Sequence, residues 1–280
     1  MKILHPLAKR FIAGFDFDSA KPVVDKLMED GYEVSLDYLG ELSSSVGDCH
    51  RAKDQYIDII NFYKDKNINI SIKPTQLGLS FMPSLAFVLL EDIAKQAVKY
   101  DHTIRLDMED SSVTEQTINL CNAMKELKLN NTGIALQSNL FRTPKDLLKL
   151  TENKVSIRLV KGAYVENQEI AHQKDFEIGA AFFDCAAHLY SHKAHKPAIA
   201  THDEELLEDI EELIPQPNYF EYELLYGIRR DLQEELKNKG YTVRIYVPFG
   251  KDWLPYTTRR LKEWKNLKFV IRNIFKEWKK

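Results

Sequence analysis

The chain has 280 residues, of which 44% are hydrophobic and 29% are charged, and its formal net charge is -3. The length fits one barrel-sized domain over residues 1–280, and the near-neutral charge gives no reason to expect a nucleic-acid partner. The three cysteines are far apart, the N-terminus lacks a signal-peptide pattern, and no apolar run approaches the roughly 20 residues that cross a bilayer, so we expect a cytoplasmic protein without a disulfide framework or structural zinc.

Eight short segments that favour β-strands recur along the chain, and sequence with helical spacing separates them. The expected strands are residues 34–37, 68–73, 103–107, 133–137, 155–160, 197–201, 219–221 and 242–247. The clearest helical patterns between them are residues 52–63, 84–100 and 113–127. Alternating strands and helices indicate a parallel sheet, and eight such units predict an α/β fold of the (β/α)8 TIM-barrel type. An open doubly wound sheet remains the alternative.

A further helix is expected before the first strand, over residues 19–30. A barrel has an open N-terminal end that needs covering, so we interpret this helix as a lid or support there.

Polar residues stand at nearly every predicted strand end. In a barrel of this kind the C-terminal strand ends converge on the active site, so these residues are its first candidates. They are Asp37, Lys73, Asp107, Gln137, Arg158 with Lys161, Thr201 with His202, Glu221, and Tyr246.

The basic residues among the candidates predict an electropositive barrel mouth. Adjacent Arg259 and Arg260 follow the last strand, and their planar guanidinium groups suit bidentate binding of a carboxylate. A solvated helix face explains the same pair equally well. No metal site is expected, because His202 is the only histidine at a predicted strand end. A Schiff-base lyase that uses Lys73 or Lys161 stays open, whereas no Gly-rich dinucleotide motif, P-loop or Gly-x-Ser-x-Gly elbow occurs.

Specific strings carry a stronger signal than the spacing does. They are SLDYLGE (35–41), SIKPTQLGL (71–79), RLDMED (105–110), RLVKGAY (158–164), ATHD (200–203), EYELLYGIRRDLQ (221–233), RIYVPFG (244–250) and YTTRRLKE (256–263). In these strings and in their order, the chain resembles the proline dehydrogenase family, and its monofunctional bacterial branch most closely.

The resemblance implies a distorted (β/α)8 barrel, with an extra N-terminal helix and a C-terminal helix, that holds non-covalent FAD across the strand ends. It further implies oxidation of L-proline to 1-pyrroline-5-carboxylate, the first step of proline catabolism to glutamate, with electrons passed to a membrane quinone. A pyrroline-5-carboxylate dehydrogenase is the implied partner for the product.

The resemblance also assigns roles to residues that match the family motifs. Asp107 and Arg158 would be catalytic, and Glu41 would pair with Arg259 to gate the site. The implied substrate-binding residues are Lys73, Leu225, Tyr246, Tyr256, Arg259 and Arg260. The implied cofactor-binding residues are Met108, Gln137, Arg158, Val160, Lys161, Gly162, Ala163, Thr201 and His202.

Two features of the motifs concern this chain in particular. The family's usual Glu-Phe-Gln before the LLYG turn is Glu221-Tyr222-Glu223 here. The carboxylate at Glu223 is expected to alter local hydrogen bonding or the flavin environment, yet to be tolerated. The bulk of Tyr246 predicts a preference for proline over 4-hydroxyproline.

The C-terminal segment, residues 262–280, is basic and aromatic. Ile271, Ile274, Phe275 and Trp278 recur at helical spacing. The favoured interpretation is a helix that packs its apolar face on the barrel, and the second hypothesis is a basic amphipathic helix on an anionic membrane surface.

Overall fold

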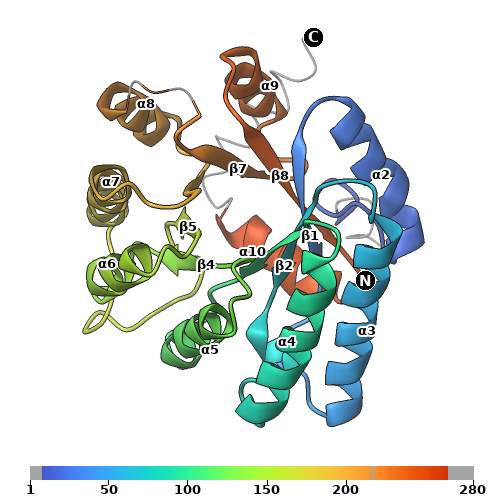
Figure 1. Ribbon diagram of the computed structural model, residues 1–280. Coiled ribbons are helices and arrows are strands. Elements are labelled where there is room, and N and C mark those ends of the chain that lie inside the picture. Colours follow the sequence, from blue (N-terminus) through green and yellow to red (C-terminus); the bar gives the residue numbers. More distant parts are fainter. Residues whose placement is uncertain (1–7, 215, 217, 264–280) are drawn as a thin grey trace.

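The chain folds into a closed barrel of parallel strands (Figure 1). The computed structural model describes residues 8–214, 216 and 218–263. The strands pair in chain order and β8 closes the ring on β1. They are β1 Glu33–Tyr38, β2 Asn69–Ile72, β3 Thr103–Leu106, β4 Thr132–Gln137, β5 Ile157–Val160, β6 Ala198–Ala200, β7 Glu221–Leu225 and β8 Val243–Phe249. The closed ring confirms the predicted barrel and excludes the open doubly wound sheet.

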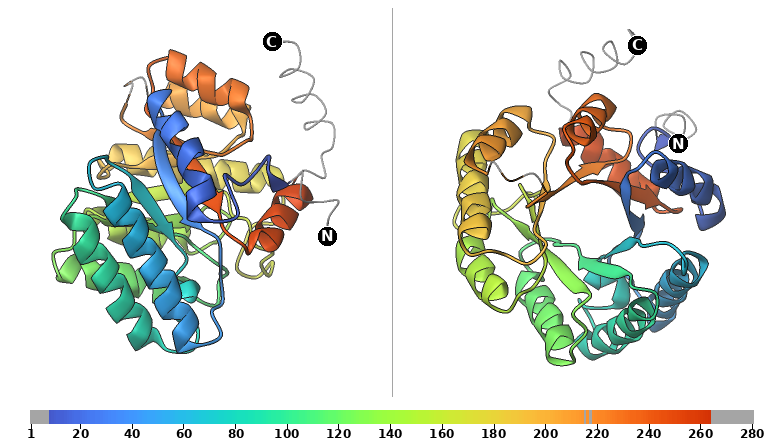
Figure 2. Two further views of the ribbon diagram at one scale, coloured as in Figure 1. Left: turned by 90° about the vertical axis from the view of Figure 1, so that its right-hand side faces the viewer. Right: turned by 45° about the horizontal axis from the view of Figure 1, so that its top comes forward.

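Helices connect the strands and form an outer ring (Figure 2, right). The predicted helical patterns at 52–63, 84–100 and 113–127 fall within or overlap three of these helices. The helices of the described residues are α2 Phe17–Glu29, α3 Val46–Phe62, α4 Pro83–Val98, α5 Thr114–Glu126, α6 Thr143–Glu152, α7 Asp175–Ser191, α8 Glu204–Leu213, α9 Arg230–Asn238 and α10 Trp253–Glu263, with the short 3-10 helix η1 Pro74–Leu77.

The seventh strand lies later in the chain than the sequence predicted. The expected strand at 219–221 is wrong, because β7 begins at Glu221 and runs to Leu225. Glutamates and apolar residues alternate from Glu221 to Leu224, a period of two that the prediction cut short. Glu221 therefore stands at the N-terminal end of the barrel, where Arg244 binds it through both carboxylate oxygens at 2.6 and 2.7 Å, and it is removed from the candidates at the strand ends.

The extra N-terminal helix exists, but it does not cover the N-terminal end of the barrel. Helix α2 takes a place in the outer ring beside β1 and β8 (Figure 1), where the Phe17 ring centroid lies 5.8 Å from that of Phe249. Its N-cap is Asp16, which forms a capping box with Ser19. The lid interpretation is therefore wrong.

Helix α10, which follows β8, lies across the C-terminal end of the barrel instead of in the outer ring (Figure 1). Its residues Pro255, Tyr256 and Arg259 line a cavity together with Lys73 from the end of β2. Because α10 leaves the ring, α2 fills the position between β8 and β1 that a regular barrel gives to its last helix. This exchange is the distortion of the barrel, and it brings two arginines over the mouth.

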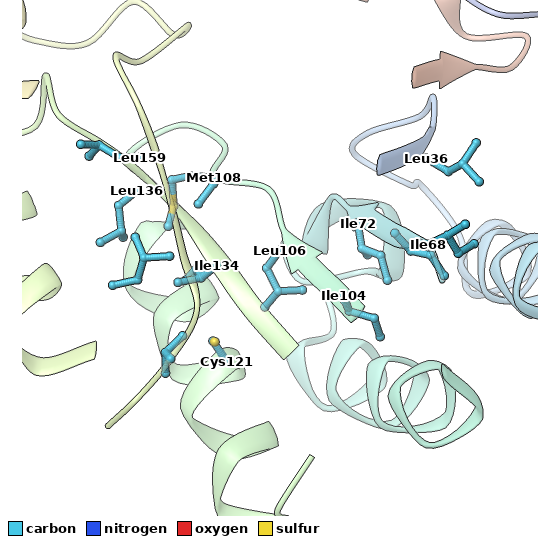
Figure 3. Packing of buried hydrophobic residues seen from close by; sticks show 14 of the residues in the cluster. Leu36, Ile68, Ile72, Ile104, Leu106, Met108, Cys121, Ile134, Leu136 and Leu159 are labelled. Atoms are coloured by element: carbon cyan, nitrogen blue, oxygen red, sulfur yellow. The ribbon is translucent and has the colours of Figure 1, made fainter. Parts of the chain in front are cut away.

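The strands turn apolar residues outward toward the helices and polar residues inward. The outward set packs in one continuous cluster (Figure 3), whose labelled members are Leu36, Ile68, Ile72, Ile104, Leu106, Met108, Cys121, Ile134, Leu136 and Leu159. The inward set includes Ser71, Arg105, Arg158 and Glu223, all buried. Because a buried charge without a partner is strongly destabilising, the stability of this interior depends on how these charged groups pair.

Within the described residues, no helix is both long and apolar enough to cross a membrane. The three cysteines are buried and unbridged. Residues 264–280, which carry most of the predicted C-terminal amphipathic helix, lie outside the described residues.

Candidate active site

A buried ammonium group occupies the centre of the C-terminal strand ends. Lys73 Nζ lies 2.8 Å from Asp37 Oδ1, 3.3 Å from Asp107 Oδ2 and 3.5 Å from the Tyr246 hydroxyl. Burial alone would lower the pKa of Lys73, but the two carboxylates raise it above its ordinary value. The lysine therefore stays protonated, whereas a Schiff-base lyase needs a neutral amine.

Asp107 joins that ammonium to the other side of the barrel. Its Oδ2 accepts a hydrogen bond of 2.6 Å from the Tyr246 hydroxyl, and its Oδ1 accepts one of 2.9 Å from Arg158 Nη2. Burial would raise the pKa of Asp107, yet Lys73 and Arg158 outweigh it and hold that pKa below its usual range. Asp107 is a carboxylate held between two cations.

The Arg158 side chain contacts residues from several strands. Besides Asp107, its Nη2 donates to Ser71 Oγ at 2.9 Å, and its guanidinium carbon lies 5.3 Å from the Tyr246 ring centroid. Its Nε lies 3.2 Å from Glu223 Oε2. Contacts from β2, β3, β7 and β8 leave this side chain little conformational freedom.

An ion pair spans the entrance to the site. Arg259 on α10 donates from Nη1 and Nη2 to both oxygens of Glu41, at 2.8 and 3.1 Å. Its guanidinium also lies 5.7 Å from the Tyr164 ring centroid. Below it is a cavity of about 260 Å³ lined by Glu41, Lys73, Tyr256 and Arg259 among others. The predicted pairing of Glu41 with Arg259 is thus present in the structure.

The expectation of an electropositive mouth is corrected by these contacts. Each of Lys73, Arg158 and Arg259 has an acidic partner, and Lys161 Nζ lies 2.5 Å from Asp203 Oδ2. The sequence placed Asp37 and Asp107 at the strand ends as well as the cations, but it did not show that they pair with Lys73 and Arg158. The site is therefore a network of ion pairs.

The predicted pocket residues come together in an apolar cluster beside the cavity. Tyr246 and Tyr256 are buried in it, and Leu225 at the end of β7 packs against it. Phe11 and Ile12 belong to the same cluster, although no motif in the sequence assigned them a role. The guanidinium of Arg260 lies 5.3 Å from the Tyr256 ring centroid, so this arginine also reaches the cluster.

The loop after β5 follows an extension of β4 along the opposite rim. Ser138 and Asn139 donate backbone hydrogen bonds to the carbonyls of Val160 and Lys161 at 2.8 and 2.9 Å. Gly162 has a φ of +120°, and a Cβ there would lie 2.3 Å from Asn139 Oδ1. Only glycine fits this close approach, which fixes the backbone from Val160 to Ala163.

The neighbouring rim carries a neutral histidine. The Leu225 N–H donates to His202 Nε2 at 3.1 Å, which assigns the proton of the neutral ring to Nδ1. Burial, together with Arg260 and Arg229, lowers the pKa of His202 to about 3. Thr201 Oγ1 accepts from the Asp203 N–H at 3.2 Å, and Gln137 Nε2 donates to the Glu109 carbonyl at 2.9 Å.

A cleft of about 520 Å³ continues outward from this rim between α7 and α8. Lys161, Asp203, Phe176 and Phe183 are among the residues that line it. Of the predicted cofactor residues, Lys161 is the one that lines this cleft. The Met108 side chain lies in the outer apolar cluster (Figure 3), so any contact with a cofactor falls to its backbone.

Comparison with known proteins identifies the family. A family model described as proline dehydrogenase matches residues 20–272. Proline dehydrogenase 1 of Bacillus subtilis strain 168 is 33% identical over 277 residues, which cover 96% of this chain and 91% of that protein. The chain belongs to the proline dehydrogenase family. Proline dehydrogenase of Deinococcus radiodurans is 33% identical over 282 residues, covering 96% of this chain and 90% of its own length.

A solved structure agrees with the fold. The crystal structure of proline utilization A from Bdellovibrio bacteriovorus, inactivated by N-propargylglycine, superposes with a TM-score of 0.84 at 23% identity. The match covers 91% of this chain and 32% of that chain, so this proline dehydrogenase family member spans about a third of that larger protein. Family membership supports an enzymatic role in proline oxidation.

The structure adds site residues to which the sequence gave no role. Asp37 was noted only as a polar strand end, and Glu109 and Tyr164 were not singled out. Glu109 accepts from the Thr75 N–H and hydroxyl at 3.0 and 2.5 Å, which ties β3 to η1. No strand pattern in the sequence marked Glu109, because it follows β3, which ends at Leu106.

The described residues contain no group of three or more His, Cys, Asp or Glu side chains that could hold a metal ion.

Proposed function

We propose that this chain oxidises L-proline to 1-pyrroline-5-carboxylate with non-covalently bound FAD and passes the electrons to a membrane quinone. The observation that carries the proposal is the cavity of about 260 Å³ that Lys73 and Arg259 both line. Such a cavity suits a small zwitterion, and the chain belongs to a family named for proline oxidation.

The substrate carboxylate would bind between Lys73, Arg259 and Arg260. Lys73 has three donors; Asp37 and Asp107 engage two of them, and the third makes a longer contact of 3.5 Å with the Tyr246 hydroxyl, which a substrate carboxylate would replace. The bidentate hold of Arg259 on Glu41 is the geometry that a substrate carboxylate would take over. Glu41 would then close the entrance when the site is empty and release Arg259 when proline arrives.

The pyrrolidine ring would lie against Tyr246, Tyr256 and Leu225. The Tyr246 hydroxyl is fixed by Asp107 at 2.6 Å, so it cannot move aside for a hydroxyl group on the substrate. This contact supports a preference for proline over 4-hydroxyproline. Replacing Tyr246 with serine should narrow that preference, measured as the ratio of kcat/KM for the two substrates.

The opposite rim fits a flavin dinucleotide by the chemistry of its groups. Among the described residues, the buried Asn139 Oδ1 has no hydrogen-bond partner, and the His202 ring offers its Nδ1 hydrogen to an acceptor. FAD would be held by Gln137, Thr201, His202, Arg158, the Met108 backbone and the loop from Val160 to Ala163. When bound, FAD would accept the hydride from the ring carbon next to the proline nitrogen.

The residues of this chain would orient the substrate and set its charge state. Anchoring the carboxylate fixes the reacting ring carbon, which is catalysis by positioning. Arg158 would stabilise negative charge that develops in the reactive region. Asp107 accepts hydrogen bonds from Lys73, Arg158 and Tyr246, and it would orient these three side chains.

Electron transfer to a quinone, and transfer of the product to a pyrroline-5-carboxylate dehydrogenase, follow from the family resemblance. A cytoplasmic enzyme that acts at the inner face of the membrane would meet both needs. Co-sedimentation with anionic vesicles, comparing the full chain with a chain that ends after Asn266, tests whether the C-terminal segment supplies the membrane contact.

A visible absorbance spectrum before and after anaerobic addition of L-proline tests the proposed function. Flavin bands that bleach with proline are the expected result. Lys73→Ala should keep the flavin bands and lose bleaching at low proline concentration, whereas Lys95→Ala, an exposed lysine on α4, should behave as the parent. A colourless protein that takes up no added FAD would overturn the proposal.

A further inference from the structure

The barrel interior holds a buried charge cluster one layer below the strand ends. Glu223 on β7 is 4% exposed and faces Arg158 on β5 and Arg105 on β3. Further toward the N-terminal end, Glu221 and Arg244 form their own bidentate pair. The four inward cations Lys73, Arg105, Arg158 and Arg244 thus stand against the four inward carboxylates Asp37, Asp107, Glu221 and Glu223.

Glu223 interacts through charge rather than through directed hydrogen bonds. Arg158 Nε is 3.2 Å from Glu223 Oε2, but the N–H does not point at that oxygen. Neither oxygen of Glu223 accepts a hydrogen bond from the described residues, and Nε and Nη1 of Arg105 make none either. The buried Glu223 carboxylate is therefore stabilised by the charges of the two guanidinium groups beside it and not by hydrogen bonds.

The ionisation of the cluster follows from its surroundings. Burial raises the pKa of Glu223 above its ordinary value, and the charges of Arg158 and Arg105 limit that rise. Burial, followed by the charge of Arg158, lowers the pKa of Arg105 to about 10, so Arg105 is still charged near neutral pH. As a carboxylate 3.2 Å from Arg158 Nε, Glu223 partly cancels the positive potential that Arg158 and Arg105 project toward the strand ends.

We propose that Glu223 is a positioning residue that acts through Arg158 and lowers the reduction potential of the bound flavin. The inference rests on the proposed function, because it requires FAD above Arg158. A flavin gains negative charge on reduction, so nearby positive charge favours its reduced form. A carboxylate at Glu223 weakens that effect, and a neutral side chain of the same shape would restore it.

The expected size follows from Coulomb's law. Removing a unit charge at a separation on the order of 10 Å, with an effective dielectric constant of about 20, changes an equilibrium constant about tenfold. For a two-electron couple, a tenfold change corresponds to about 30 mV. Glu223→Gln should therefore raise the midpoint potential of the flavin by about 30 mV, which is a tenfold shift of the equilibrium toward the reduced form.

The measurement is the midpoint potential of the FAD-loaded protein, equilibrated anaerobically against a dye of known potential. Glu221→Gln is the matched control, because it removes the same charge from the same strand two residues farther from the strand ends. Its shift should be clearly smaller than that of Glu223→Gln. An unchanged or lower potential in Glu223→Gln overturns the inference, and equal shifts in the two variants overturn it as well.

If Glu223→Gln fails to fold, a second variant with the opposite expected shift in potential tests the inference. Arg105→Gln removes the cation on the other side of Glu223 and should lower the potential, and an unchanged potential there contradicts the inference. The proposed function fails separately, when the parent protein binds no FAD or its flavin is not bleached by proline. Bleaching by proline with an unmoved potential in the variants overturns only the role of Glu223.

Discussion

Replacing Asp37 with asparagine tests how Lys73 is held. Asp37 is fully buried, and its Oδ1 is the nearest carboxylate oxygen to Lys73 Nζ, at 2.8 Å against 3.3 Å for Asp107. Removing one partner of a buried ion pair outright costs about 3–5 kcal/mol. Asparagine keeps an acceptor oxygen and Asp107 keeps its charge, so we expect a loss of about 1–2 kcal/mol.

Two readouts separate stability from function in this variant. For a chain of this size, 1 kcal/mol lowers Tm by about 2–4 °C, so Asp37→Asn should melt roughly 2–8 °C below the parent. The KM for proline should rise about tenfold, because 1.4 kcal/mol of lost positioning of Lys73 corresponds to a factor of about ten. Asp58→Asn, an exposed carboxylate on α3, is the control and should change neither value. A parental Tm together with a parental KM in Asp37→Asn would refute this account of Lys73.

Three further predictions follow from contacts at the rim. Glu41→Ala should lower the KM for proline several-fold, because the substrate carboxylate no longer has to displace Glu41 from Arg259. The Tm should change little, because this ion pair is partly solvated. The folded-state pKa of Asp107 lies below its ordinary 3.8, so its stabilisation is full above that pH and is lost as the pH falls through the folded value. Asp107→Asn should therefore flatten the dependence of unfolding free energy on pH below about pH 4, as measured by denaturant titration. Gly162→Ala should cost about 1–3 kcal/mol by thermal unfolding and weaken FAD retention, because of its positive φ and the contact with Asn139.

Much of the fold could be predicted because its signals are local. The alternation of short apolar strands with helical spacing indicated the barrel, and helix α2 was expected close to where it begins. Its docking was not predictable in the same way. A helical pattern shows which face is apolar but not which strands it meets, and the place of α2 depends on α10 leaving the ring nearly the whole chain length away.

The site residues show the same division between local and distant information. Motifs located Lys73, Asp107, Arg158 and Tyr246 at the strand ends, since each motif lies within a few residues. Their partners come from other strands, 34 to 173 positions away for the contacts of Lys73 alone. Whether a cation meets a carboxylate across a barrel depends on register and stagger, which no local pattern contains.

The paired charges also change how the site would handle the substrate amine. A purely cationic pocket would favour the neutral amine by repulsion. With Asp37, Asp107 and Glu41 beside the cations, an incoming ammonium group meets no net repulsion. The zwitterion can then bind as it exists in solution, and the balance shifts toward the neutral amine only when the substrate carboxylate displaces Glu41 from Arg259. Binding and loss of the amine proton are, on this reasoning, coupled through the same ion pair that closes the entrance.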